Sequence, residues 1–178
     1  MSTTGSGAYA WYPNDALSQA SNAVQFMRAL GAERWEDLVR CGDEDPERFH
    51  RALLDHADFR FYRPYDAVLD ESRGAPWARW CVGGTTNVVL NVLDRWRGTP
   101  TFDKTAIDWE GEDGSRRTLS YRELDRVVCR LAGGLRSLRL KPGDVIATYL
   151  PNLPEAMVAM LAVAKIGAIV MPLFSGFG

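Results

Sequence analysis

Apolar residues recur at helical spacing after residue 120, where they define the clearest predicted element of the chain. The segment Ser120-Tyr121-Arg122-Glu123 has the spacing of a capping box. The apolar stripe that follows consists of Leu124, Val127, Val128, Leu131, Leu135 and Leu138. A stripe of this period is typical of an amphipathic helix that packs one face on a core. The pattern therefore predicts a helix that begins after Ser120.

Continuous apolar runs take over nearer the end of the chain. Residues 145–150 and 168–174 are predicted as short strands, and residues 154–166 between them as a helix that is apolar nearly all round. From residue 141 to residue 178 only four side chains are charged, namely Lys141, Asp144, Glu155 and Lys165. This composition predicts a βαβ unit in a parallel sheet that is buried on both faces.

Strict alternation replaces the helical period just upstream of residue 120. Residues 105–109 alternate as a half-buried strand does, residues 110–117 form a charged turn with Gly111 and Gly114, and residues 118–120 return as a short strand. The order of strand, glycine-containing turn and strand predicts a β-hairpin.

The first 60 residues predict helices in an acidic segment. Asp15 is placed to cap a helix that Gly31 ends. The apolar face of this helix consists of Val24, Phe26, Met27 and Leu30. Residues 35–39 predict a second, short helix. The acidic run 43–45 precedes Pro46, and a capping carboxylate before a proline in the first turn is typical of a helix start, which we favour over a metal site.

Aromatic and turn-forming residues dominate the stretch from residue 59 to about residue 103. The aromatic residues that we single out are Phe59, Phe61, Tyr62, Tyr65, Trp77, Trp80 and Trp96. Aromatic side chains beside arginines can stack nucleobases, but such surfaces lie in a basic groove. Here Asp58, Asp66 and Asp70 offset the arginines. We therefore expect an irregular segment that packs against a larger body.

Together these patterns predict an α/β chain in which a helical and irregular N-terminal leader precedes the first βαβ unit of a larger, mostly parallel sheet. We divide it into a flexible leader at residues 1–10, a helical and aromatic extension at residues 11–103, and the start of an α/β domain at residues 104–178. A parallel sheet that stops after two strands leaves an edge and an apolar face without partners. We therefore expect a truncated domain that self-associates in isolation.

Composition and charge narrow the functional classes. The 178 residues are 46% hydrophobic and 25% charged, which is enough apolar side chain for a folded core. With 21 basic and 23 acidic residues the formal net charge is −2, so no basic field favours a nucleic acid or an anionic membrane surface. The longest apolar stretch, residues 156–169, contains Lys165 and is shorter than the roughly 20 residues of a membrane span.

Cysteine and histidine spacing gives no sign of a metal site. Cys41, Cys81 and Cys129 are odd in number and far apart, which predicts neither a disulfide framework nor paired metal ligands and favours the cytoplasm. His50 and His56 are six residues apart, whereas helical metal pairs are three or four apart. Residues 1–10 hold neither a basic cluster nor an apolar segment, so we do not interpret them as a signal peptide.

Beyond these patterns, an ordered succession of motifs after residue 10 resembles the start of an AMP-forming acyl-CoA synthetase, and most closely the acetyl-CoA synthetase branch of the adenylate-forming superfamily. The motifs include Trp11-Tyr12-Pro13, Gly74-Ala75-Pro76-Trp77-Ala78-Arg79-Trp80, Leu93-Asp94-Arg95, Ala106-Ile107-Asp108-Trp109-Glu110-Gly111-Glu112, Leu119-Ser120-Tyr121-Arg122-Glu123-Leu124, Leu150-Pro151-Asn152-Leu153-Pro154-Glu155 and Phe174-Ser175-Gly176-Phe177-Gly178. No single motif carries the resemblance; the order of the motifs makes it specific.

The resemblance implies an enzyme that joins a carboxylate to ATP as an acyl-adenylate and passes the acyl group to CoA. For the full-length enzyme it implies ATP, Mg²⁺ and CoA as cofactors and a small carboxylic acid as substrate. The family's phosphate-binding loop, acyl pocket, ribose-binding aspartate and adenylation lysine have no counterpart here, so we expect no catalytic residue, no metal site and no bound cofactor in these residues. The stretch 83–87 has glycines but lacks the lysine of the phosphate loop.

One turn is a candidate ligand contact. In acetyl-CoA synthetases a Phe-Gly-Gly turn walls the pocket for the adenine end of CoA, and Phe174, Ser175 and Gly176 occupy the corresponding place. A turn at the carboxyl end of a parallel strand also lies where α/β sheets bind ligands. Ser175 departs from the glycine of acetate enzymes, which leaves acetate, propionate and longer acids open. An ordinary strand-to-helix turn with Phe174 in the core is the alternative.

Three functional hypotheses follow. The first is the N-terminal fragment of an acid–CoA ligase, inactive by itself. The second is a free-standing, non-catalytic interaction module derived from the same family. The third is a fragment of a related enzyme that loads a carrier protein, against which the aromatic leader of the acetyl-CoA synthetase branch argues.

Overall fold

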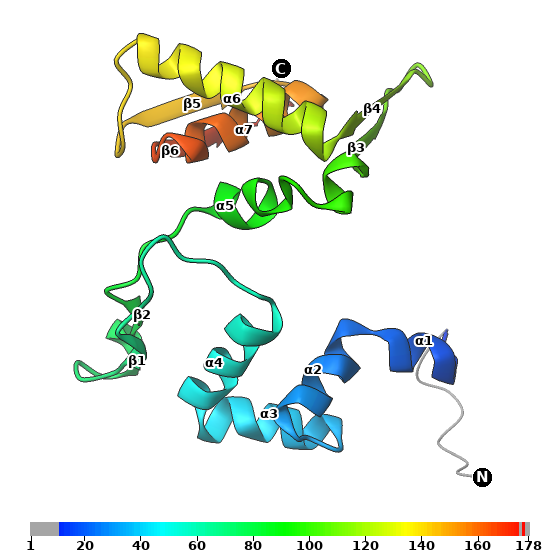
Figure 1. The fold of residues 1–178 in the computed structure, drawn as a ribbon, viewed down its shortest axis with the longest axis vertical. Coiled ribbons are helices and arrows are strands. Elements are labelled where there is room, and N and C mark those ends of the chain that lie inside the picture. Colours follow the sequence, from blue (N-terminus) through cyan, green and yellow to red (C-terminus); the bar gives the residue numbers. More distant parts are fainter. Residues whose placement is uncertain (1–10, 175, 177–178) are drawn as a thin grey trace. The chain divides into compact units, whose positions relative to one another are not determined.

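The computed structural model describes residues 11–174 and residue 176, and these residues form two compact units. The N-terminal unit holds residues 11–59 and 65–83, and the C-terminal unit holds residues 60–64 and everything described from residue 84 onward. Figure 1 colours the elements of both along the chain. The domain boundary that we expect between residues 103 and 104 stays a prediction.

Four helices build the first part of the N-terminal unit. They are α1 (Asp15–Ala20), α2 (Asn22–Leu30), α3 (Trp35–Glu44) and α4 (Pro46–His56). The single helix expected from Asp15 to Leu30 is wrong in one respect, because Ser21 interrupts it. The Ser21 hydroxyl accepts from Val24 N–H at 3.3 Å and caps α2, while Asn14 rather than Asp15 caps α1. Gly31, with φ of 78°, ends α2 as expected.

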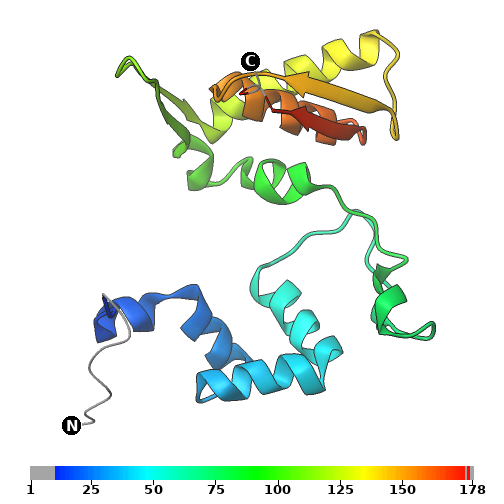
Figure 2. The same cartoon turned by 180° about the vertical axis from the view of Figure 1, so that it is seen from behind.

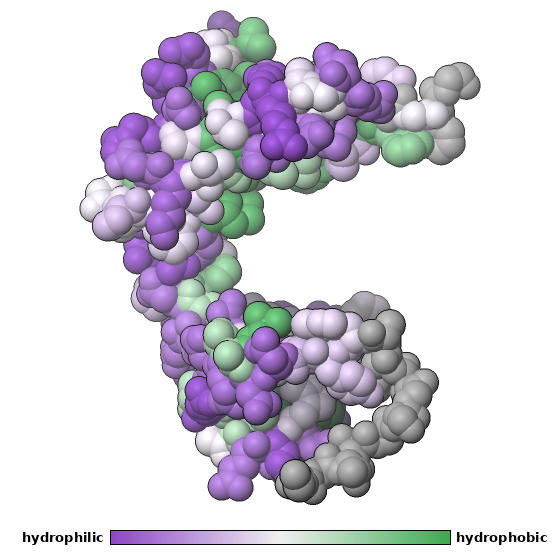
Figure 3. Space-filling view, turned by 90° about the vertical axis from the view of Figure 1, so that its right-hand side faces the viewer, coloured by the Kyte–Doolittle hydropathy of each residue, from purple (hydrophilic) through white to green (hydrophobic). Residues whose placement is uncertain are grey.

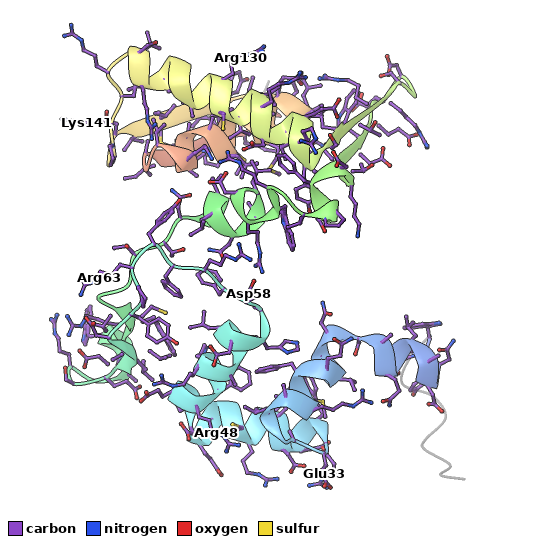
Figure 4. The ribbon with its side chains drawn as sticks, in the orientation of Figure 1. Glu33, Arg48, Asp58, Arg63, Arg130 and Lys141 are labelled. Carbon is purple, nitrogen blue, oxygen red and sulfur yellow. The ribbon has the colours of Figure 1, made fainter. Side chains whose placement is uncertain are left out.

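The start of α4 at the acidic run is confirmed. Asp45 accepts from Arg48 N–H at 3.0 Å, and Pro46 occupies the first turn. The Arg48 guanidinium, labelled in Figure 4, reaches back to the carbonyl oxygen of Leu30 at 3.2 Å. The buried residues of these helices are Phe26, Leu30 and Leu38. The small core of the N-terminal unit therefore lies among α2, α3 and α4.

The aromatic stretch contains a strand pair that the sequence pattern did not predict. β1 (Ala67–Asp70) and β2 (Arg79–Val82) pair antiparallel, with Leu69 opposite Trp80, and η1 (Ala75–Trp77) lies between them. The Trp80 ring lies against His50 of α4, with 4.2 Å between the ring centroids. Trp77, Tyr62 and Trp80 are all exposed, so within the described residues these three do not show the expected packing of the aromatics against a larger body.

The C-terminal unit begins with short helical turns. These are α5 (Val88–Val92), η2 (Asp94–Trp96) and η3 (Pro100–Asp103). Asn87 caps α5, since its Oδ1 accepts from Val89 N–H at 2.9 Å. Val89 and Leu93 are almost completely buried and belong to the same core as α6 and α7. The end of the aromatic stretch is therefore part of the α/β body.

The predicted hairpin and its following helix are both confirmed. β3 (Thr105–Glu110) and β4 (Arg116–Ser120) pair antiparallel, and α6 runs over Tyr121–Ser137. The capping box is complete: Glu123 N–H donates to the Ser120 hydroxyl at 3.2 Å, and Ser120 N–H donates to Glu123 Oε2 at 2.9 Å. Leu124, Val128 and Ala132 form the buried face of α6.

The βαβ unit is confirmed as well. β5 (Val145–Tyr149), α7 (Pro154–Lys165) and β6 (Ile169–Leu173) follow one another, and the strands pair parallel with Val145 opposite Ile169 and Tyr149 opposite Leu173. In Figures 1 and 2, α6 runs alongside β5. Lys141, labelled in Figure 4, lies in the connection between α6 and β5, where its backbone N–H donates to Asp144 Oδ2 at 2.8 Å.

Burial of both sheet faces is the expectation that the described residues do not meet. Ile146 and neighbouring side chains pack on the core that α6 and α7 share. The side chains that alternate with them are exposed, and we call them the open sheet face: Val145, Ala147, Tyr149, Ile169, Met171 and Leu173. Apolar residues are exposed elsewhere as well. Figure 3 shows hydrophobic residues, in green, among hydrophilic residues, in purple, on the face that it draws.

Candidate functional site

The carboxyl ends of β5 and β6 lie next to each other at one edge of the C-terminal unit. Because Tyr149 pairs with Leu173 in a parallel ladder, Leu150 and Phe174 begin the two following segments at the same end of the sheet. Ligands of α/β proteins bind outside the carboxyl ends of parallel strands. We call this region, formed by residues 150–153 and Phe174, the carboxyl edge.

Two of the candidate site residues, Phe174 and Gly176, lie close together at the carboxyl edge. Phe174 is 68% exposed, so it does not lie in a core of the described residues. A Cβ atom on Gly176 would lie 2.7 Å from Cε1 and Cζ of the Phe174 ring, so a side chain at position 176 would displace the ring. The predicted site residue Ser175 lies outside the described residues. An exposed aromatic ring beside bare backbone offers a stacking surface to a planar ligand.

The hairpin β3–β4 contacts the carboxyl edge and the start of α7. The Trp109 indole N–H donates to the carbonyl oxygen of Asn152 at 2.7 Å. Arg117 donates to both carboxylate oxygens of Glu155, at 2.6 and 3.1 Å, and these hydrogen bonds lower the pKa of Glu155 and raise the pKa of Arg117. Sequence reasoning missed these contacts, because a backbone carbonyl as partner leaves no pattern in the residue types.

A cavity of about 490 Å³ opens between the hairpin turn and the loop at residues 151–153. Trp109 and Leu153 provide apolar lining, and Glu110, Glu112 and Asp113 provide carboxylates. Glu110 accepts from Arg116 at 2.6 Å, and Asp113 accepts from Ser115 N–H at 2.9 Å. Hydrogen bonds from the Ser115 side chain and from its backbone N–H lower the pKa of Asp113. Glu110 and Asp113 therefore stabilise the turn of the hairpin.

Ionic contacts also join Arg97, which follows η2, to α6. Arg97 donates to both oxygens of Asp125, at 2.6 and 3.0 Å, and approaches Cys129 Sγ at 3.4 Å. Burial is the largest single influence on Asp125 and raises its pKa, but the hydrogen bond and charge of Arg97, together with Cys129 and Lys165, lower the pKa by more, so the net pKa is lowered. Burial raises the pKa of the Cys129 thiol, which favours its protonated form. The cluster therefore holds elements together.

Several site classes have no support in the described part of the chain. Residues 11–174 and 176 contain no group of three or more His, Cys, Asp or Glu side chains that could hold a metal ion. The three cysteines are free thiols. Within the same residues, no helix has both the length and the apolar composition that crossing a bilayer requires.

The stretch at residues 83–87 makes hydrogen bonds to neighbouring segments. Thr85 N–H donates to the Arg63 carbonyl oxygen at 2.9 Å, and Thr85 in turn accepts from Arg63 N–H through its hydroxyl at 3.1 Å. The side chain of Asn87 caps α5 and also donates to the Ala164 carbonyl oxygen at the end of α7, at 2.7 Å. The stretch therefore fixes its neighbours by hydrogen bonds of its own backbone and side chains.

Two family models match consecutive parts of the chain. The model described as the acetyl-coenzyme A synthetase N-terminus matches residues 35–92, and the model described as AMP-binding enzyme matches residues 93–178. The boundary between them falls at Leu93, inside the C-terminal unit.

Curated relatives and a solved structure agree with these matches. An acetyl-coenzyme A synthetase of Chlorobaculum tepidum is 39% identical over 165 residues, which are 93% of this chain and 24% of the relative. One from Mycobacterium tuberculosis is 48% identical over 142 residues, or 79% of this chain and 21% of the relative. The solved acetoacetyl-CoA synthetase from Streptomyces lividans superposes on 94% of this chain and 27% of its own, with a TM-score of 0.84 and 30% identity. The chain thus spans about a quarter of the length of these proteins.

Proposed function

Because the chain belongs to the acetyl-CoA synthetase-like enzymes, whose N-terminal portion it matches, we propose that it is the N-terminal part of an acid–CoA ligase. This ligase activates a short-chain carboxylate with ATP as an acyl-adenylate and transfers the acyl group to CoA. The observation that carries the proposal is the succession of two family matches, the acetyl-coenzyme A synthetase N-terminus followed directly by the AMP-binding enzyme.

The contribution of this chain to the ligase is at the carboxyl edge. We assign Phe174, Ser175 and Gly176 to the wall of the pocket for the adenine end of CoA. The exposed ring of Phe174 and the close approach of Gly176 to it support this role, since a planar base stacks on an aromatic face. The acid stays open among acetate, propionate and longer acids.

The chemistry of adenylation belongs to other parts of the enzyme. ATP chemistry needs a cationic cradle for phosphates and a metal held by carboxylates. Within the described residues no group of three or more His, Cys, Asp or Glu side chains comes together, and we assign no step of the reaction to these residues. We expect the 178-residue chain by itself to be inactive and to bind no cofactor, and we propose that the enzyme to which it belongs acts in the cytoplasm.

A free-standing interaction module is the second candidate, and the open sheet face supports it because apolar exposed faces bind polypeptides. A carrier-protein-loading enzyme is a weaker candidate, since the match to the acetyl-coenzyme A synthetase N-terminus favours a CoA ligase. Activity in the presence of CoA separates the ligase from both.

ATP–pyrophosphate exchange and CoA-thioester formation test the proposal together. The full-length enzyme that contains this chain should exchange pyrophosphate in the presence of acetate or propionate and form the thioester with CoA, whereas the 178-residue chain should give only background. Exchange by the chain at a rate comparable with an intact ligase would overturn our assignment of adenylation to other residues.

The role of Phe174 has its own test in the full-length enzyme. Phe174→Ala should raise the KM for CoA several-fold and leave pyrophosphate exchange unchanged, because exchange does not involve CoA. Trp77→Ala is the matched control, since Trp77 is an aromatic residue of similar exposure, 66% against 68%, in the N-terminal unit. An unchanged KM for CoA in Phe174→Ala would remove Phe174 from the CoA pocket.

A further inference from the structure

We infer that Trp109 is a positioning residue for the carboxyl edge: its indole N–H fixes the loop at residues 150–153 and thereby the edge on which Phe174 lies. The inference deepens the proposed function, since it rests on the role of Phe174 in the CoA pocket. It concerns a residue of the hairpin, which precedes the βαβ unit in the chain.

Two contacts from neighbouring strands clamp the same connection. Trp109 in β3 donates to the Asn152 carbonyl oxygen at 2.7 Å, and Arg117 in β4 binds both oxygens of Glu155 in the first turn of α7. Trp109 and Arg117 are directly opposite in the hairpin, and the Arg117 guanidinium carbon lies 5.9 Å from the centroid of the Trp109 ring. The hairpin therefore holds the β5–α7 connection at two adjacent points.

The backbone of the loop at residues 150–153 is conformationally restricted. Pro151 precedes Asn152 and Pro154 begins α7, so the φ angles on both sides of residues 152 and 153 are restricted by proline rings. Leu153 N–H donates to the Pro151 carbonyl oxygen at 2.8 Å, which closes the loop on itself. Fixing the carbonyl of Asn152 thus fixes the course of the backbone after Tyr149.

The connection between the loop and Phe174 is the register of the parallel strands. Tyr149 is opposite Leu173, so Leu150 and Phe174 leave the sheet side by side. Figures 1 and 2 agree in placing the hairpin at the end of the sheet toward which the β5 arrow points. A shift of the loop therefore changes the surroundings of the Phe174 ring without any direct contact from Trp109.

The hairpin turn is shaped to accept the indole ring. A Cβ atom on Gly111 would lie 2.7 Å from Cη2 of Trp109, so the ring approaches the backbone of the turn more closely than a side chain at position 111 would allow. Gly111 N–H also donates to the Ser115 carbonyl oxygen at 2.8 Å. The turn of the hairpin thus packs against the Trp109 ring, and the indole N–H points toward the loop at residues 150–153.

Trp109→Phe tests the inference, because it keeps an aromatic ring and removes only the donor. In the 178-residue chain, hydrogen exchange of the Leu153 amide should accelerate about fivefold, the effect of losing one typical hydrogen bond, while the amides of α6 stay unchanged. In the full-length enzyme the KM for CoA should rise several-fold, with kcat and pyrophosphate exchange unchanged. Trp35→Phe, at an exposed tryptophan of α3, is the matched control and should alter none of these.

Each outcome bears on a distinct claim. Unchanged exchange at Leu153 in Trp109→Phe would overturn the clamp. Faster exchange with an unchanged KM for CoA, in an enzyme whose KM does respond to Phe174→Ala, would overturn the positioning role and leave the proposed function intact. An enzyme that responds to neither variant would instead contradict the CoA pocket itself. Should Trp109→Phe fail to fold, Arg117→Gln tests the second contact of the clamp by the same two readouts.

Discussion

Lys165, the last residue of α7, donates to both carboxylate oxygens of Asp94, at 2.6 and 2.9 Å, across 71 positions of sequence. Both side chains are mostly buried, with 19% and 18% of their surfaces exposed. Asp94 directly follows the fully buried Leu93, so the ion pair joins η2 to the helix of the βαβ unit. Both residues lie within the second family match, which begins at Leu93.

Breaking this pair should destabilise the chain. Lys165→Met removes the ammonium and leaves the Asp94 carboxylate mostly buried, with only Arg97 at 3.2 Å as a remaining cation. We expect a loss of about 2 kcal/mol in the free energy of unfolding, measured by urea denaturation. Arg116→Gln is the control: its pair with Glu110 is 71% and 59% exposed, so the change should stay within about 0.5 kcal/mol. Equal effects of the two variants would contradict the structural role of Lys165.

Acid should weaken the fold through Asp125. Burial raises the pKa of this carboxyl group, but the hydrogen bond and charge of Arg97, together with Cys129 and Lys165, hold it below the ordinary value of 3.8 in the folded chain. A carboxyl group with a lowered folded pKa contributes stability that is fully present above 3.8 and is lost as the pH falls through the folded pKa. Urea denaturation between pH 7 and pH 3 should therefore show decreasing stability below about pH 4, and Asp125→Asn should flatten this decrease. A variant with the same acid dependence as the original chain would show that Asp125 is not responsible.

The open sheet face should drive self-association of the isolated chain. Light scattering across a concentration series should show a rising mass, because the exposed apolar side chains and the strand edges lose contact with water when two copies meet. Met171→Lys should reduce the association. Val39→Lys is matched to it, since Val39 of α3 and Met171 are both 45% exposed, and it should not. A strictly monomeric chain at high concentration, with residues 154–174 protected from hydrogen exchange, would contradict this prediction.

Local signals along the chain were enough to predict most elements of the C-terminal unit. The capping box at Ser120 and Glu123, the alternation before it and the apolar runs after it each determine structure within a few residues. The strand pair β1–β2 lacked such a signal: Leu69 and Trp80 are paired across a loop whose turn residues indicated only irregular structure. The same is true of Ser21, whose side chain splits a helix that hydrophobic spacing alone would continue.

The candidate site was predictable in part, for a related reason. Phe174 and Gly176 follow a strand and resemble a family motif, so their place at the carboxyl edge could be expected. The contacts of Trp109 and Arg117 with residues 152 and 155 depend on how the hairpin packs on the βαβ unit, which no local pattern encodes. The exposure of one sheet face could not be predicted from local sequence either. Continuous apolar strands indicate burial whether or not the residues that would cover them are present.

The coding sequence downstream of the Gly178 codon tests the central claim most directly. If the chain is the N-terminal part of an acid–CoA ligase, the reading frame continues and encodes a loop rich in Ser, Thr and Gly with a following Lys, the phosphate-binding element of the family. A natural stop codon immediately after Gly178 would contradict this account and would favour the free-standing interaction module instead.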